Sequence, residues 1–288
     1  MVGTNASGKS GLGVRLAERF NGEIISADSR QIFKGLDLGS GKITESEMHG
    51  IKHHLLDVCE PNEFFSMADF QEQAYAAIED ILSRSKLPFI VGGTGLYVDS
   101  VADGYVLSAN APDLKYREEL ETYETKELTA MLDRLAPGHG IDPKNRNRVM
   151  RRLERLHAGD DITPKSEPRY DVLRLGVTWP REKLCERIDE RLERRMNEGM
   201  VDEIKNLMAN GATPEFLDKL GLEYRYIYRY VAGIIPTEEE MLDELGRAIK
   251  RFAKRQMTWF RKNKSTVWLD MQNDPFEQAC SEIDGFIK

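Results

Sequence analysis

In the N-terminal part of the chain, short apolar runs alternate with stretches whose apolar residues recur at helical spacing. Leu12, Leu16 and Phe20 lie on one face of a 3.6-residue period, which predicts a helix. The apolar run at 23–27 then predicts a short buried strand that ends at Asp28.

A second helix is expected to begin at Ser66, because Ser66 and Asp69 have the spacing of a capping box. Its expected apolar face consists of Phe70, Ala74, Ile78 and Ile81. A further strand is predicted at 89–91 and ends at Gly92-Gly93-Thr94. Apolar strands that alternate with helices indicate a parallel sheet with helices on both faces.

The pattern changes between residues 109 and 161, where strand signals vanish and charged helical segments follow at 115–135 and 146–157. Strand signals return at 172–179 and 266–269, with helices expected between them at 181–208 and 237–262. We therefore predict an α/β core formed by residues 1–108 and 162–288. Residues 109–161 are predicted to form a mostly helical insertion domain.

The segment Gly3-Thr4-Asn5-Ala6-Ser7-Gly8-Lys9-Ser10 matches the phosphate-binding P-loop pattern in full. Its glycines let backbone N–H groups converge on phosphate oxygens, and the following helix adds a favourable dipole. Lys9 is the expected phosphate ligand, and the Ser10 hydroxyl is the expected ligand of Mg²⁺. Only Met1 and Val2 precede the loop, so we expect residues upstream of Met1 to complete the first strand.

Composition narrows the class of protein. The 288 residues are 40% hydrophobic and 31% charged, as in ordinary globular domains, and apolar runs such as 87–91 are too short to span a bilayer. The three cysteines Cys59, Cys185 and Cys280 are odd in number and widely separated. That arrangement argues against a disulfide framework or a cysteine-built metal site, and it is typical of the cytoplasm. We expect a cytoplasmic monomer without a membrane partner.

Asp28 and Thr94 both follow predicted strands, so they should meet at the edge where open α/β sheets bind their ligands. An aspartate before serine is also a common turn residue, and Gly-Gly-Thr is often only a tight turn. Arg187 and Arg191 share one helical face. They are either solvated side chains or groups that reach a phosphate.

The net charge of −8 argues against a polyanionic partner, but two local runs are strongly basic. The run at 144–155 has Glu154 as its one acid, and the run at 247–264 has none. Such concentrations favour binding to a nucleic-acid backbone. Phe252, Trp259 and Phe260 lie within the second run, where they either stack on bases or belong to the core of an amphipathic helix.

Eight segments in this order resemble bacterial tRNA dimethylallyltransferases, which are also called tRNA isopentenyltransferases. They are residues 3–10, 25–31, 35–39, 53–57, 65–70, 91–97, 187–191 and 254–260. The resemblance implies transfer of a dimethylallyl group from dimethylallyl diphosphate to N6 of adenosine 37, beside the tRNA anticodon. On this interpretation the P-loop binds the pyrophosphate leaving group with Mg²⁺, rather than ATP.

The resemblance also implies roles for individual residues. Asp28 would be the general base toward the adenine amino group. Arg191 would stabilise the charge that develops on the phosphates, and Thr94 would assist at the same phosphates or orient the reacting groups. The implied contacts to the anticodon stem-loop are Asp28, Ser29, Arg30, Gln31, Arg117, Arg148, Arg151, Arg152, Arg251, Lys254, Arg255 and Gln256.

The chain departs from the family pattern at three places. Thr4-Asn5 replaces the usual Pro-Thr, and Arg151-Arg152-Leu153-Glu154 replaces Arg-Ala-Leu-Glu. Gly221-Leu222-Glu223-Tyr224 stands where Gly-Tyr-Lys-Glu is common, so no role is transferred to it.

Three other functions use the same features. A small-molecule P-loop kinase shares the core, but it leaves the basic runs unexplained. An RNA-binding protein with a regulatory nucleotide site leaves Asp28 and Thr94 unexplained. An adenylate isopentenyltransferase has the same chemistry on free nucleotides, but it has no need of a basic helical insertion.

Overall fold

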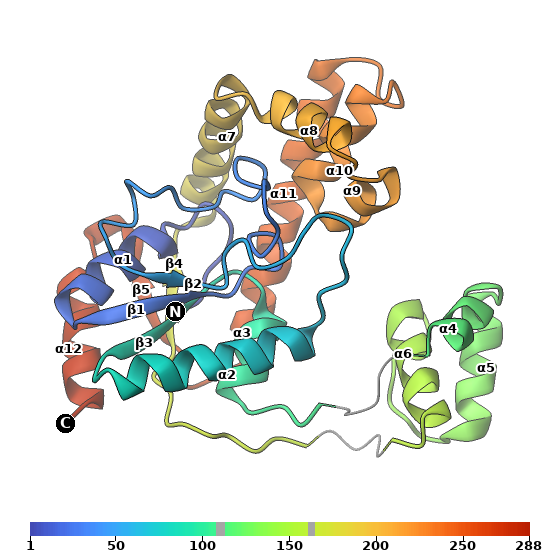
Figure 1. Cartoon of the computed structure of the whole chain (residues 1–288), viewed down its shortest axis with the longest axis horizontal. Coiled ribbons are helices and arrows are strands. Elements are labelled where there is room, and N and C mark those ends of the chain that lie inside the picture. The colour runs from blue at the N-terminus through green and yellow to red at the C-terminus, as the bar shows by residue number, and fades with distance from the viewer. Residues whose placement is uncertain (108–112, 161–164) are drawn as a thin grey trace. The chain divides into compact units, whose positions relative to one another are not determined.

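The computed structural model describes residues 1–107, 113–160 and 165–288, and these residues form two compact units (Figure 1). The first unit combines Met1–Ala102 with Arg169–Lys288, and the second is Asp103–Pro168. The predicted domain boundaries, at 108/109 and 161/162, lie outside the described residues. In the part of the chain that is described, no helix is long and apolar enough to cross a membrane.

The first unit is built on parallel strands, as predicted. Strand β1 (Gly22–Ser26) pairs on one side with β2 (His53–His54) and on the other with β3 (Leu87–Val91). Strand β4 (Leu175–Thr178) pairs with β5 (Val267–Asp270). Val2 forms parallel bridges to both Gly92 and Gly176, so it links the two ladders directly before the P-loop. The carboxyl ends of β1, β3 and Val2 therefore meet at one edge.

Helices cover both faces of this sheet, which confirms the predicted α/β architecture (Figure 1). Neighbouring β1 residues point to opposite faces, because Ile25 packs with α2 (Met67–Ser83) and α3 (Gly95–Ala102), whereas Ile24 packs with α1 (Lys9–Arg19). The last helix, α12 (Phe276–Phe286), packs beside α1 over β4 and β5. The predicted Ser66–Asp69 capping box is present at the start of α2.

A helical layer completes the first unit. It comprises α7 (Arg181–Asn197), α8 (Met200–Ala209), α9 (Pro214–Leu220), α10 (Leu222–Val231) and α11 (Glu238–Phe260). A 3₁₀ turn at Met271–Asn273 follows β5. The prediction of one helix at 181–208 was wrong, because Gly199 adopts φ +99° and separates α7 from α8. Fully buried Tyr224 lies in the core that these helices share.

The second unit contains α4 (Leu114–Glu121), α5 (Thr125–Leu135) and α6 (Arg146–His157), so its described part is helical, as predicted. Leu120, Leu132 and Leu153 are fully buried in its own small core. The predicted helical segment 115–135 is interrupted between α4 and α5, where Glu124 and Glu127 form a capping box that starts α5.

The buried carboxylate of Glu154 joins α6 to α4. Arg117 donates to it from Nε at 2.5 Å and from Nη2 at 3.0 Å, and Arg151 Nη1 donates at 3.1 Å. Burial alone would raise the pKa of Glu154, but the hydrogen bonds from the two arginines outweigh burial and hold the pKa below its ordinary value. The ion pair therefore acts as a clamp between the two helices.

Glu154→Gln is expected to lower the free energy of unfolding of this unit by about 1–3 kcal/mol, because a buried charged hydrogen-bond acceptor is lost. Hydrogen exchange of the α4 and α6 amides in the full chain measures the change. Glu118→Gln, at an exposed position of α4, is the matched control, with an expected change within about 0.5 kcal/mol. Equal protection in the two variants would show that the clamp does not stabilise the unit.

Candidate active site

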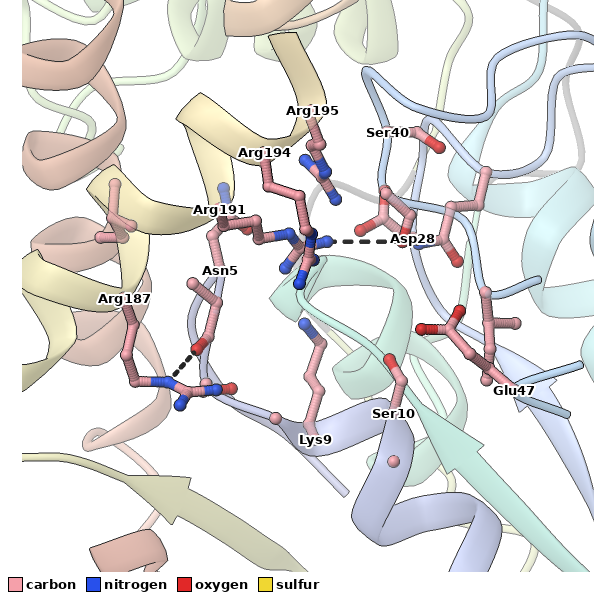
Figure 2. Close-up of a pocket in the computed structure, with 18 of the residues that line it drawn as sticks. Asn5, Lys9, Ser10, Asp28, Ser40, Glu47, Arg187, Arg191, Arg194 and Arg195 are labelled. Atoms are coloured by element: carbon pink, nitrogen blue, oxygen red, sulfur yellow. Dashed lines mark hydrogen bonds between the residues drawn. The ribbon is translucent and has the colours of Figure 1, made fainter. Parts of the chain in front are cut away.

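The P-loop leads from Val2, which is bridged to the sheet, directly into a helix, as its sequence predicts. Helix α1 begins at Lys9, and its N-cap, Gly8, adopts φ +85°, a conformation that favours glycine. The Ser7 hydroxyl donates to the Thr4 carbonyl at 2.8 Å and tightens the loop. A cavity of about 670 Å³ opens over the loop (Figure 2).

Three distant side chains hold the loop in place. Trp179 Nε1 donates to the Ser7 carbonyl at 2.9 Å, and Arg187 Nε donates to the Ala6 carbonyl at 3.0 Å. The Asn5 amide donates to Gln256 Oε1 at 3.0 Å. The loop is therefore fixed from the end of β4, from α7 and from α11.

Cationic side chains converge on the cavity from the P-loop and from α7. Arg187, Arg191 and Arg195 recur every four residues, so they share the face of α7 that lines the cavity (Figure 2). The lysine and arginines that line the cavity are Lys9, Arg15, Arg30, Arg187, Arg191, Arg194 and Arg195. Cations outnumber the lining carboxylates Asp28, Glu47, Glu190 and Glu223.

This crowding changes how the cations ionise. Burial, together with the neighbouring arginines, lowers the pKa of Lys9 to about 8 against the opposing effect of Asp28. Burial and the adjacent Arg195 lower the pKa of Arg191 to about 10. Buried cations that repel one another in a cleft are suited to binding a polyanionic ligand, which neutralises their charge.

Asp28 and Thr94 meet at the carboxyl ends of β1 and β3, as their positions predict. Asp28 is 8% exposed and lines the cavity, and its Oδ1 accepts from the Arg30 amide at 3.0 Å. The Thr94 hydroxyl accepts from the Ser29 amide at 3.0 Å. Asp28 thus has both of the roles that its sequence suggested, a turn contact and a place in the cavity. Thr94 holds the segment that carries Asp28.

The residues predicted to contact tRNA in the first unit differ in accessibility. Arg251, Lys254 and Arg255 are exposed on α11 and form no ion pair within the described residues. Gln256 is 6% exposed, and its amide bridges the P-loop to the Gly93 carbonyl. Gln31 spans from the Ser26 hydroxyl to the Gly41 carbonyl.

The aromatic residues of the same run divide between core and surface. Phe260 is buried, and Trp259 Nε1 donates to Asp99 at 2.7 Å, so these two rings belong to the packing of the unit. Half-buried Phe252 lies between two arginines, with the Arg30 and Arg255 guanidinium carbons 5.4 and 5.5 Å from the ring centroid.

The arginines of the second unit that were predicted to contact tRNA differ in exposure and in ion pairing. Arg117 and Arg151 are paired with Glu154, whereas Arg148 is exposed and Arg152 is half-buried, and neither forms an ion pair among residues 113–160. Contact of these four arginines with tRNA stays a prediction. Arg148 is the one that is both exposed and without an ion pair among residues 113–160.

Several lining residues were not predicted from the sequence. Arg195 could have been found, because it extends the Arg187–Arg191 spacing by one turn. Glu47 and Glu223 had no local signal. Away from the cavity, Glu23, His54 and Asp80 lie close enough to hold a metal ion, but Arg84 and Lys86 already bind the Glu23 carboxylate.

A parallel sheet, a P-loop at its switch point and a cation-lined cavity define the class: a P-loop protein with a site for a phosphorylated ligand. Comparisons with known proteins then identify the family. The family model described as IPP transferase matches residues 31–263. The chain belongs to this family, the tRNA dimethylallyltransferases.

The bacterial relatives match along nearly their whole length. A tRNA dimethylallyltransferase from Anoxybacillus flavithermus is 41% identical, and the match covers 100% of this chain and 95% of the relative. The tRNA dimethylallyltransferase 2 of Shewanella sediminis is 42% identical, and the match covers 98% of this chain and 96% of the relative. The structure of the tRNA isopentenylpyrophosphate transferase from Bacillus halodurans is 39% identical, with a TM-score of 0.75, and the match covers 99% of this chain and 93% of that one. A eukaryotic dimethylallyltransferase acting on tRNA is 26% identical, with a TM-score of 0.83 and coverage of 99% and 78%.

Proposed function

We propose that this chain transfers the dimethylallyl group of dimethylallyl diphosphate to N6 of adenosine 37 in tRNA and releases pyrophosphate. The observation that carries the proposal is the composition of one cavity. Phosphate-binding groups, namely the P-loop and Arg191, share it with a nearly buried carboxylate, Asp28. A prenyl transfer from a diphosphate to an amine needs both.

The phosphate side favours departure of the leaving group. As the allylic C–O bond breaks, negative charge grows on the pyrophosphate oxygens. Lys9, Arg191 and the P-loop line that volume, so they would stabilise this charge without large reorganisation. The same groups would bind the substrate diphosphate more weakly than the product.

The carboxylate of Asp28, in the same cavity, favours attack by the adenine amine. The exocyclic amine of adenine is a weak nucleophile, because its lone pair is delocalised into the ring. Asp28 takes up the amine proton as the N–C bond forms, which avoids an N-alkylated cation. The target base has to leave the anticodon stack to reach the cavity.

The oxygen donors that line the cavity fit Mg²⁺, which prefers hydroxyl, carboxylate and phosphate oxygens. Ser10 is the expected protein ligand, with Asp28 and Glu47 lining the same cavity. Mg²⁺ bound beside the diphosphate would neutralise charge on the leaving group.

The affinity for inorganic pyrophosphate is expected to fall as pH rises above 8. The pKa of Lys9 is about 8, so below pH 8 its side chain is an ammonium ion before the ligand binds. Above pH 8 the free side chain is neutral, and it must take up a proton when pyrophosphate binds. One coupled proton corresponds to about a tenfold loss of affinity per pH unit. Titration calorimetry between pH 7 and 9.5 measures the change.

Lys9→Arg is the control for this prediction, because its guanidinium stays charged over the whole range. The profile of the variant contains only the titration of pyrophosphate itself and of the remaining groups. If pyrophosphate affinity changed with pH in the same way for the variant and the natural protein, Lys9 would not be the group that takes up the proton.

The proposal is tested with labelled dimethylallyl diphosphate, Mg²⁺ and unmodified tRNA that carries adenosines at positions 36 and 37. Label is expected in the tRNA, with one pyrophosphate released for each group transferred. A parallel reaction with ATP and no dimethylallyl diphosphate tests the kinase alternative. Unlabelled tRNA together with phosphate transfer from ATP would overturn the proposal.

A further inference from the structure

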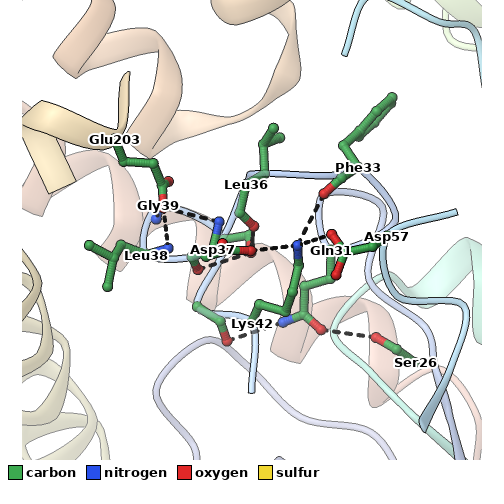
Figure 3. Close-up of polar contacts among 12 residues, drawn as sticks. Ser26, Gln31, Phe33, Leu36, Asp37, Leu38, Gly39, Lys42, Asp57 and Glu203 are labelled. Carbon is green, nitrogen blue, oxygen red and sulfur yellow. Dashed lines mark hydrogen bonds and ion pairs between the residues drawn. The ribbon is translucent and has the colours of Figure 1, made fainter. Parts of the chain in front are cut away.

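One wall of the cavity is made by backbone rather than by side chains. Residues 37–41, called here the tip turn, bring Gly39, Ser40 and Gly41 to the cavity lining. The turn is fixed at its base by Lys42, whose ammonium group donates to the Phe33 carbonyl at 3.1 Å and to Asp37 Oδ1 at 2.7 Å (Figure 3).

A carboxylate from a distant helix caps the other side of the turn. Glu203 of α8 accepts from the amides of Asp37 at 3.1 Å, Leu38 at 2.6 Å and Gly39 at 3.0 Å (Figure 3). The buried Tyr224 hydroxyl also donates to Glu203 Oε1, at 3.1 Å. Three consecutive amides on one carboxylate fix the direction in which the turn leaves the helical layer.

The tip turn presses against the arginines of α7. The Gly41 carbonyl accepts from Gln31 Nε2 at 3.2 Å and, in a longer contact, from Arg191 Nη2 at 3.5 Å. A Cβ added to Gly41 would lie 1.4 Å from an Arg195 guanidinium nitrogen and 1.9 Å from Arg191 Nη2. Both arginines therefore rest directly on the Gly41 backbone.

Gly39 allows the same close approach to the helical layer, because an added Cβ would lie 2.6 Å from Tyr224 Cζ. The turn is thus packed between Tyr224 and the α7 arginines, with Glu203 setting its position. A displacement of the turn changes where Arg191 and Arg195 can point.

We infer that Glu203 is a positioning residue for the transfer reaction: it holds the tip turn so that the Gly41 backbone directs Arg191 and Arg195 toward the pyrophosphate. The inference rests on the proposed function for its reaction. Glu203 contacts the turn and is not among the residues that line the cavity, so it acts through the arginines. Its removal affects pyrophosphate more than tRNA.

The test is a double-mutant cycle of Glu203→Gln and Arg191→Gln in the full chain, with inorganic pyrophosphate and Mg²⁺ as the probe. Glu203→Gln alone is expected to weaken pyrophosphate affinity roughly tenfold and kcat roughly 10–100-fold, with KM for tRNA unchanged. The double variant is expected to lose less than the sum of the two single losses, because Glu203 acts partly through Arg191 and residues that act as a unit are non-additive.

Asp202→Asn is the matched control, since it removes an exposed carboxylate one residue away on α8 and is expected to change neither quantity. Tyr224→Phe removes only one of the contacts to Glu203, so it repeats the cycle in a milder form should Glu203→Gln not fold. Additive losses in the cycle, or pyrophosphate affinity equal to that of the natural protein, would overturn the inference. Pyrophosphate binding is measured independently of transfer, so a natural protein that binds pyrophosphate but modifies no tRNA would refute the proposed function alone.

Discussion

Asp28→Asn is expected to lower the rate of dimethylallyl transfer by roughly 10²–10⁴-fold, the range for loss of a general base. The asparagine has the same shape, and its Oδ1 can still accept from the Arg30 amide, so the turn after β1 is retained. It cannot take up the proton of the adenine amine at neutral pH. Single-turnover measurements with tRNA already bound isolate this step.

The same variant separates the two roles that the position allows. Asp28 is 8% exposed and therefore offers little surface to the tRNA. A catalytic role predicts that the variant reacts slowly but binds tRNA with an unchanged Kd. If Asp28 served only to contact the nucleic acid, the variant would instead retain its rate at saturating tRNA and lose affinity. That second result would remove the general base from the proposed mechanism.

Lys9→Met is expected to reduce kcat by roughly 10²–10³-fold, as does the loss of one preorganised electrostatic group in other active sites. Lys9 is the P-loop cation, and its Nζ lies 3.4 Å from the carbonyl oxygen of Thr4, near the start of the loop. Methionine preserves the length and the apolar stem of the side chain, so folding is retained. The change removes only the charge that faces the leaving group.

The effect of Lys9→Met on substrate binding should be smaller than its effect on kcat, because charge on the pyrophosphate is greatest as the C–O bond breaks. Steady-state kinetics with varied dimethylallyl diphosphate measures both. Lys183→Met, on the exposed side of α7, is the control and is expected to leave both unchanged. A Lys9→Met variant with only a raised KM would mean that Lys9 binds the ground state and transition state equally.

The features of the fold that could be predicted from the sequence are those with a local signal. The P-loop pattern, the Ser66–Asp69 capping box and the apolar run of β1 each specify their own geometry within a few residues. Parallel pairing followed from the alternation of strands and helices. The placement of Asp28 and Thr94 at one edge followed from that topology.

The contacts that could not be predicted join segments far apart in sequence. Glu203 caps amides that precede it by more than 160 residues, and no periodicity of the chain encodes that meeting. Gln256 was grouped with its basic neighbours, although it follows Ile249 and Ala253 along the buried face of α11. The helical period of α11 separates Gln256 from the exposed cations.

Mass spectrometry of nuclease-digested tRNA, after reaction with dimethylallyl diphosphate and Mg²⁺, shows directly which nucleoside is modified. We expect one nucleoside, adenosine 37, to gain a single dimethylallyl group, and fragmentation to place the group on the base at N6. Untreated tRNA should lack this product, and the Asp28→Asn sample should contain far less of it after the same reaction time. An unmodified adenosine 37 in the complete reaction, or a dimethylallyl group found only on free nucleotides, would contradict this expectation.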